Sequence, residues 1–246
     1  MLLFFYVTYE VEGYIVLVVD DLLKCVVAPN INDVSLELYK EFAEKHLMNR
    51  TFFYEFTDGD SISICFTEWG IYHMLAIQHI DSHIKKTSFF SSIENGLSFD
   101  TFRSDTKKNL RFKKQKKRIT MFACVYNTLI NGEIFYLPSG KVRNTADVKV
   151  DYIAYDKLTN VAPTGATYNG INIGIRIIDD ICVPLTVLIS TNSNVTEYID
   201  SEEKKIVKRL VIKDEDGNVV FEKNHKIQPG FSASHDEVGT DTFRAS

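Results

Sequence analysis

The segment from Lys107 to Arg118 has the strongest concentration of one charge in the chain. Eight of its twelve residues are lysine or arginine, and none is acidic. The chain has a formal net charge of −5, so removing these eight positive charges leaves the remainder at −13. Clustered Lys and Arg side chains are typical of phosphate-binding surfaces. All eight are therefore candidate phosphate contacts: Lys107, Lys108, Arg111, Lys113, Lys114, Lys116, Lys117 and Arg118.

This basic run lies in the first half of a helix predicted over about 108–130. Apolar residues of that helix recur every three or four positions: Phe112, Ile119, Phe122, Tyr126 and Leu129. The N-terminal end of a helix is the positive end of its dipole, and a cation in its first turn costs about 0.3–1 kcal/mol at low salt. Many lysine-rich helix faces are simply solvated. A run that opposes helix stability nevertheless favours an anionic partner.

A second candidate is His73, which lies in the nearly apolar stretch 71–84, predicted to be a buried helix. At 100° per residue, His73 shares a face with Ile77, Ile80 and Ile84, whereas Tyr72, His79 and His83 lie on another side. Aliphatic surroundings disfavour the charged imidazole and lower its pKa. Such a histidine is either a core residue bonded to backbone or a general acid/base in the wall of a cleft.

Metal and disulfide chemistry are weakly indicated. His79 and His83 have the i,i+4 spacing of metal ligands, but no third ligand with suitable spacing accompanies them, so we predict neither a metal site nor a cofactor. The four cysteines form no CxxC pair and lie far apart: Cys25, Cys65, Cys124 and Cys182. Most of them lie in apolar runs and resemble small hydrophobic residues. This usage indicates a reducing compartment, and we expect the cytoplasm.

The elements that position these residues change in kind along the chain. Helices are expected over about 32–47, with a cap at Asn32-Asp33, and over 87–95 and 98–106. A hairpin is expected over 51–66, because Thr57-Asp-Gly-Asp60 separates two β-prone runs. After Asn131-Gly132 the pattern becomes that of strands, over 133–137, 149–156, 172–178, 182–190, 204–214 and 218–223. The sequence thus predicts an α+β fold in which N-terminal helices pack on a mainly antiparallel β-sheet.

We divide the chain into four parts. Residues 1–30 form an N-terminal β segment, 31–198 the main domain, 199–227 a β-hairpin extension, and 228–246 a polar tail predicted to be disordered. The apolar N-terminus is interrupted by acidic residues and Gly13, and no basic residue precedes it. We therefore predict two short strands that turn near Glu12-Gly13, and no contact with a membrane.

Several segments resemble one family. Phe66-Thr-Glu-Trp-Gly-Ile-Tyr-His-Met-Leu-Ala-Ile-Gln-His-Ile80 resembles the His-Leu-Leu-Gly-Ile/Leu helix of phage-associated predicted nucleases. These belong to the barnase–EndoU–colicin–RelE (BECR) class, and the match is to its fourth phage-associated family. The resemblance covers about 35–195 and includes 39–47, Thr51–Glu55, Ser139–Lys141, Asp151–Tyr155, Gly174–Arg176 and Pro184–Val187. The sequence departs from the family at Met74, where the family has leucine, and at Ala76, where it has glycine.

The resemblance implies a BECR-like fold and metal-independent cleavage of RNA, in which the ribose 2′-oxygen attacks the adjacent phosphorus. It assigns acid/base catalysis to His73 and phosphate contacts to Lys141 and Arg176. Thr186 or Ser190 would supply a hydroxyl hydrogen bond. The basic run would guide the RNA backbone. DNA is disfavoured as a substrate because it lacks the 2′-hydroxyl, and the class implies an antitoxin or immunity protein as a second partner.

Our interpretation is a toxin-like endoribonuclease. Two alternatives stay open: a non-catalytic phage or mobile-element module that binds nucleic acid or an acidic protein through 107–118, and a degenerate nuclease that keeps only the fold. Strand scission distinguishes the first interpretation from the other two, whereas binding alone does not.

Overall fold

The computed structural model describes residues 10–11, 14–15, 17–145, 148–162, 165–190, 194, 196–199 and 202–225, and the tail predicted from 228 lies outside them. Two short strands, β1 (Glu10–Val11) and β2 (Tyr14–Ile15), pair antiparallel, as expected for a turn near Glu12-Gly13. No helix of the described part of the chain is long and apolar enough to cross a membrane.

The first α-helix begins later than the sequence indicated. After a 3₁₀ segment, Val19–Lys24, α1 spans Leu36–Ala43 and continues as one turn of π-helix over Glu44–Met48. Its cap is Ser35, whose side chain accepts a hydrogen bond from the backbone N–H of Leu38 at 3.0 Å. The predicted cap at Asn32-Asp33 is wrong, because the Asp33 carboxylate accepts instead from the backbone N–H of Asn30.

The helix expected over 71–84 is two helices. They are α2 (Glu68–Met74) and α3 (Ile77–Ile80), and Ala76 between them has the left-handed backbone conformation with φ 58°. A continuous helix cannot pass through a left-handed residue, so the two segments point their side chains differently. Alanine gives no sequence signal for such a break, which glycine or asparagine would have given.

The helical region ends with a short pair of helices and a long one. The pair are α4 (Phe89–Glu94) and α5 (Phe99–Ser104), close to their predicted ranges. The helix predicted over 108–130 is α6 (Thr106–Met121), a 3₁₀ turn (Phe122–Cys124) and α7 (Val125–Asn131). All five residues of its predicted apolar stripe are buried. Asp105 caps α6 by accepting from the backbone N–H groups of Lys107 and Lys108, so an acidic residue offsets part of the cost of the cations there.

The remaining elements form one nine-stranded sheet with the order β11-β10-β3-β4-β8-β7-β6-β5-β9. Its strands are β3 (Arg50–Phe56), β4 (Ser61–Cys65), β5 (Glu133–Tyr136), β6 (Tyr152–Ala162), β7 (Gly165–Ile178), β8 (Ile181–Ser190), β9 (Glu203–Lys205), β10 (Val207–Asp214) and β11 (Val219–Asn224). Every neighbouring pair is antiparallel except β4 and β8. The predicted α+β class, with helices packed on a mainly antiparallel sheet, is confirmed.

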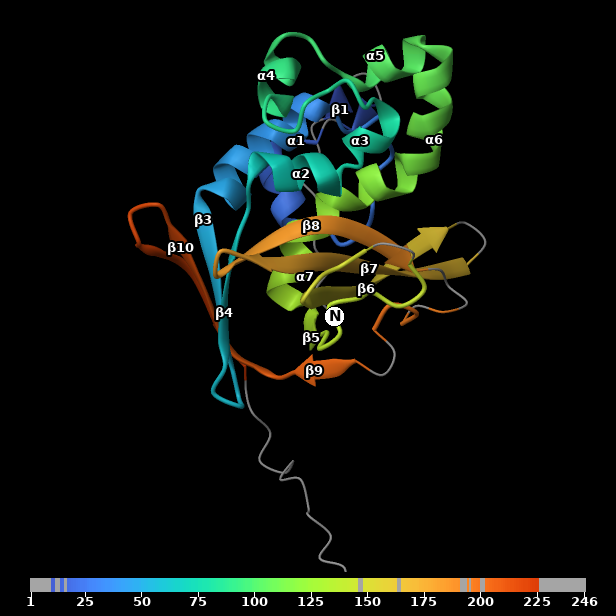
Figure 1. The fold of residues 1–246 in the computed structure, drawn as a ribbon. Coiled ribbons are helices and arrows are strands. Elements are labelled where there is room, and N and C mark those ends of the chain that lie inside the picture. The colour runs from blue at the N-terminus through green and yellow to red at the C-terminus, as the bar shows by residue number, and fades with distance from the viewer. Residues whose placement is uncertain are drawn as a thin grey trace, which may run out of the picture.

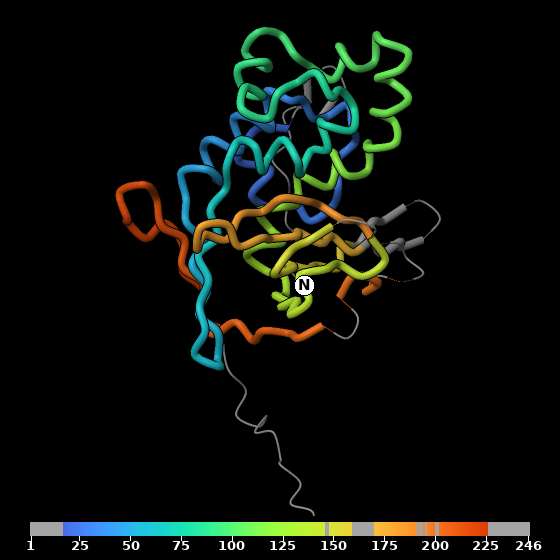
Figure 2. The backbone as a smooth tube through the Cα atoms, in the orientation of Figure 1, coloured from blue at the N-terminus to red at the C-terminus, as the bar shows by residue number. Residues whose placement is uncertain are grey.

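Helices α1–α6 gather on one side of the sheet, and the long strands β6, β7 and β8 run beneath them (Figure 1). Tyr39 of α1 donates a hydrogen bond from Oη to the carbonyl oxygen of Ile119 in α6, and Tyr54 of β3 donates to that of Leu129 in α7. The first of these buried phenols connects α1 to α6, and the second connects β3 to α7. The segment 199–227 contributes β9 at one edge and β10 with β11 at the other, and the β10–β11 hairpin projects from the body of the sheet (Figure 2).

Candidate functional site: a cationic cavity between the helices and the sheet

A cavity of about 350 Å³ lies where α2, α3 and α6 face β7, β8 and the loop before β6. Its lining residues are His73, Gln78, His79, Arg118, Val148, Lys149, Val150, Arg176, Leu185, Thr186 and Leu188. Among these described residues, three carry a permanent positive charge, two are histidines and none is acidic. A cavity of this composition favours an anion such as a phosphate group.

Three of the four residues that the sequence proposed for chemistry meet in this cavity: His73, Arg176 and Thr186. The fourth, Lys141, is exposed and is not among the lining residues. It forms an isolated antiparallel bridge with Lys149, which does line the cavity. Ser190, the alternative hydroxyl, is fully buried beside the Asn172 amide rather than in this cavity.

Close packing through two glycines brings α2 and the strands together. A Cβ on Gly70 in α2 would lie 2.7 Å from the carbonyl oxygen of Pro184 in β8. The close approach of α2 to β8 therefore requires a residue without a Cβ at this position. A Cβ on Gly174 would lie 2.6 Å from Cγ2 of Thr186 and 2.8 Å from Cγ1 of Val150. These glycines therefore set the distance between His73, three residues after Gly70, and the strand that carries Thr186.

Arg118, the last cation of the basic run, holds the wall of the cavity together. Its Nε donates to the carbonyl oxygen of Met74 at 2.9 Å, and its Nη2 donates both to the carbonyl oxygen of His73 and to Oγ1 of Thr186 at 3.0 Å. Carbonyls in the last turn of a helix lack intrahelical partners, and a guanidinium fork can satisfy two of them together. Burial lowers the pKa of Arg118 to about 10, so it stays charged at neutral pH.

His73 is half-buried and has aromatic neighbours. Its ring meets the rings of Tyr72 and Trp69 edge-on, at centroid distances of 5.2 and 6.1 Å. Burial, and then the positive charges of Lys86, Arg118 and His79, lowers the pKa of His73 below its ordinary value. No carboxylate of the described residues contributes to that shift. The imidazole is thus neutral at pH 7, the form that accepts a proton.

His79 is the site residue that the sequence reasoning missed. The continuous helix expected over 71–84 placed it away from His73, but the left-handed turn at Ala76 redirects α3 so that both histidines line the cavity. Burial and the charge of Arg118 lower the pKa of His79 as well. The alanine itself gave no signal for that turn, and the only hint was the resemblance, in which the nuclease family has glycine at the position of Ala76.

The two histidines with metal-ligand spacing do not share a site. His83 is exposed and absent from the cavity lining, and its backbone N–H donates to the Asp81 carboxylate at 3.1 Å. Across the described ranges, no group of three His, Cys, Asp or Glu side chains is arranged to hold a metal ion.

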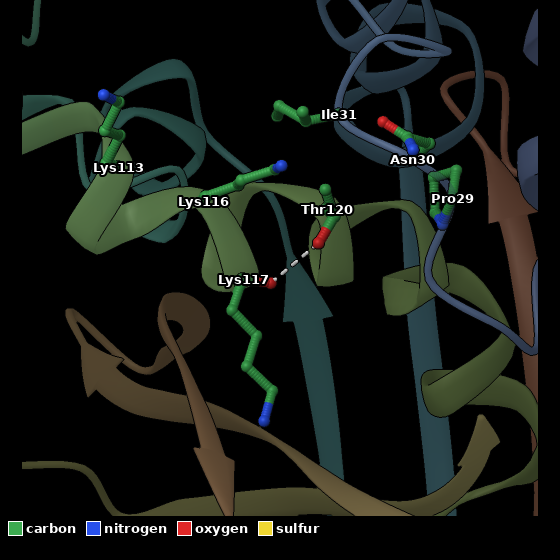
Figure 3. Close-up of a pocket in the computed structure, with 7 residues that line it drawn as sticks. All are labelled: Pro29, Asn30, Ile31, Lys113, Lys116, Lys117 and Thr120. Carbon is green, nitrogen blue, oxygen red and sulfur yellow. Dashed lines mark hydrogen bonds between the residues drawn. The ribbon is translucent and has the colours of Figure 1, made fainter. Parts of the chain in front are cut away.

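The cations of the basic run serve different parts of the structure. Lys108 forms an ion pair with the buried Asp81 at 2.7 Å, and Arg118 belongs to the cavity just described. Lys113, Lys116 and Lys117 line a second cavity of about 410 Å³ on another face of α6 (Figure 3). The other three, Lys107, Arg111 and Lys114, are exposed. Helix α6 therefore borders two cavities, each lined by cations.

Comparisons of the chain with protein-family models, curated proteins and solved structures gave no significant match. The resemblance to BECR nucleases therefore stays a prediction that rests on the segments quoted for it. The described structure supports an α+β protein with an acid-free cationic cavity that contains two histidines.

Proposed function

We propose that this chain is a metal-independent endoribonuclease, toxin-like in its action on RNA. The observation that carries the proposal is the joint presence of His73 and His79 in one cavity with three permanent cations and no carboxylate. A phosphodiester contributes the negative charge that this cavity lacks. Two imidazoles supply the proton acceptor and the proton donor that cleavage of RNA requires.

The proposed reaction balances with these groups. One neutral imidazole removes the proton of the ribose 2′-hydroxyl, and the 2′-oxygen forms a bond to the adjacent phosphorus. The bond from phosphorus to the 5′-oxygen breaks, and the second imidazole, protonated, donates its proton to that oxygen. The products are a 2′,3′-cyclic phosphate and a 5′-hydroxyl. We assign one role to His73 and the other to His79, because both line the cavity, where burial lowers the pKa of each imidazole below its ordinary value.

Charge stabilisation comes from the cations. Arg176 is exposed on β7 and Lys149 is exposed in the loop before β6, so both are available to the phosphoryl oxygens as negative charge develops on them. Arg118 is already bonded to the backbone of α2 and to Thr186, and we treat it as a positioning residue that fixes His73. A ribonuclease of this kind requires restraint in its host, and we propose an antitoxin or immunity protein for that purpose.

A second candidate is a binding module without catalysis. It is favoured by the exposed side chains of Lys113 and Lys116, which have no ion-pair partner in the described structure. Such a module would bind nucleic acid or an acidic protein in a salt-sensitive manner and leave RNA intact.

The deciding experiment is incubation of total bacterial RNA with the full chain in the presence of EDTA. Three proteins are compared: wild type, His73→Ala and His83→Ala, the last removing an exposed histidine outside the cavity. We expect scission by wild type and by His83→Ala, and loss of about 10²–10⁴-fold in rate for His73→Ala, the range for an acid/base group. Binding of RNA by all three proteins without scission by any would favour the binding module instead.

A further inference from the structure

The second cavity on α6 lies on a different face from the site of proposed cleavage. One wall consists of Lys113, Lys116, Lys117 and Thr120, which follow one another at helical spacing. The opposite wall is the loop Pro29–Ile31 that precedes α1. Figure 3 shows Lys116 extending toward that loop, whereas Lys117 points away from it toward the strands.

Two lysines of this cavity lack a counter-charge in the described part of the chain. Lys113 and Lys116 are exposed and have no ion-pair partner among the described residues, and no lining residue is acidic. Several described lysines are paired with carboxylates: Lys40 with Glu44 and Glu94, Lys45 with Asp20, Lys108 with Asp81, Lys204 with Glu133, and Lys205 with Asp58, Asp60 and Glu203. Lys113 and Lys116 differ from other unpaired lysines in lining a cavity together, so an anion from outside the chain can supply their counter-charge there.

The loop side of the cavity offers a polar donor. The Asn30 side-chain oxygen accepts from the backbone N–H of Asn32 at 3.1 Å, and the Asn30 backbone N–H donates to the Asp33 carboxylate at 3.2 Å. Asp33 is thus used within the turn and does not line the cavity. The Asn30 side-chain amide nitrogen has no hydrogen-bond partner in the described structure. Two ammonium groups and an amide donor suit a phosphodiester oxygen.

The distance between the two cavities can be expressed as a number of nucleotides. A helix with its side chains is about 10–12 Å across. A strand of RNA that crosses α6 therefore spans about two to four nucleotides, at roughly 3.4 Å per stacked nucleotide and up to twice that when extended. Arg118 lies at one end of that path and Lys116 at the other.

We propose that the cavity lined by Lys113, Lys116 and Asn30 binds a backbone phosphate of the RNA substrate, two to four nucleotides from the phosphate that is cleaved. This subsite makes the enzyme prefer substrates that extend past α6 on one side of the scissile bond. The inference rests on the proposed ribonuclease function and adds to it a requirement for substrate length.

The test is a series of oligoribonucleotides that contain one cleavage site and are lengthened stepwise on the 5′ side or on the 3′ side. Cleavage is measured for wild type, for Lys113→Gln/Lys116→Gln, and for the control Lys208→Gln/Lys213→Gln. The control removes two exposed positive charges from β10 that line neither cavity and lie outside the basic run. Folding of each variant is checked by circular dichroism.

For wild type and control we expect a stepwise gain in kcat/KM when the strand is extended by two to four nucleotides on one side only. The Lys113→Gln/Lys116→Gln variant should lose that step through a KM about tenfold higher, with kcat unchanged, and should cleave the shortest substrate normally. Its log–log salt slope for binding should decrease by roughly 0.7 for each phosphate that the variant no longer neutralises.

The two hypotheses fail differently. If wild type cleaves short and long RNA but the two double variants show the same length dependence, the subsite is refuted and the ribonuclease stands. If wild type cleaves no substrate of any length, the ribonuclease is refuted, and the subsite is refuted with it. A control variant that loses the step as fully as Lys113→Gln/Lys116→Gln would mean that the net charge of the protein matters and this cavity does not, which also refutes the subsite.

Discussion

Replacement of Arg118 by methionine tests whether one residue connects the basic helix to the wall of the candidate active site. Methionine keeps much of the apolar stem but removes the donors to Met74, His73 and Thr186. The carbonyl oxygen of His73 keeps a second bond from the backbone N–H of Ala76 at 3.0 Å. The main losses therefore fall on the Met74 carbonyl and the buried Thr186 hydroxyl.

The magnitude follows from two opposing contributions. Each hydrogen bond from a charged donor contributes about 1.5–3 kcal/mol to the free energy of unfolding, so two contribute about 3–6 kcal/mol. Burial of the guanidinium, which lowers its pKa from the ordinary arginine value to about 10, costs about 3 kcal/mol at roughly 1.4 kcal/mol per pKa unit. The difference predicts that Arg118→Met destabilises the fold by about 0–3 kcal/mol, or roughly 0–12 °C in Tm for a chain of this size.

The assay is urea unfolding followed by circular dichroism and by fluorescence of Trp69, the single tryptophan, whose ring lies next to His73. The matched control is Lys114→Met, an exposed residue one helical turn earlier, expected within about 0.5 kcal/mol of wild type. The pKa of His73, measured by NMR, should rise in Arg118→Met because one of the charges that lower it is gone. Equal unfolding free energies for the two variants, with an unchanged His73 titration, would refute this role of Arg118.

Three further predictions concern the same region. Burial and nearby cations hold the pKa values of His73 and His79 below 6.5, so one neutral and one protonated imidazole coexist only on the acidic side of that value. The pH profile of kcat/KM for RNA cleavage should therefore peak below pH 6.5 and fall as the pH rises. A maximum above pH 7 would contradict this assignment. Ala76→Gly should change the free energy of unfolding by less than about 1 kcal/mol, because relief of the left-handed conformation offsets the lost methyl burial and the greater freedom of the unfolded chain. Ala76→Val should destabilise the fold by about 2 kcal/mol or more. Equal stabilities of the two variants in urea would contradict the left-handed turn. Gly174→Ala should destabilise by about 1–3 kcal/mol and reduce cleavage by displacing Thr186 or Val150, whereas Gly59→Ala, at an open turn position, should leave cleavage unchanged.

Much of the fold was predictable because its signals are local. Asp58-Gly59 marks the β3–β4 hairpin, and Gly59 has the positive φ of 95° that such a turn requires. The apolar spacing of the long helix identified its buried face, although it gave no sign of the 3₁₀ turn at Phe122–Cys124. Local patterns also separated the helical half from the sheet, and so predicted the α+β class.

The arrangement of the candidate site was less predictable because it depends on two non-local features. Ala76 is fully buried and left-handed without a local sequence signal, and this turn brings His79 into the cavity with His73. Arg118 looked like one more cation of a solvated run, and only contact with β8, 68 residues away in sequence, gives it its role. The residue types alone predicted phosphate chemistry. The three-dimensional arrangement was needed to show which cations line which cavity.

The central claim, that the cavity containing His73 and His79 cleaves RNA through the 2′-hydroxyl, is tested most directly by the chemistry of one scissile position. A defined oligoribonucleotide that wild type cuts is compared, in EDTA, with the same strand carrying a single 2′-deoxyribose at that position, and the product ends are identified by mass spectrometry. We predict a 2′,3′-cyclic phosphate and a 5′-hydroxyl from the ribose strand, and no cleavage at the deoxyribose although the strand still binds. Cleavage of both strands, or products that begin with a 5′-phosphate, would contradict the mechanism.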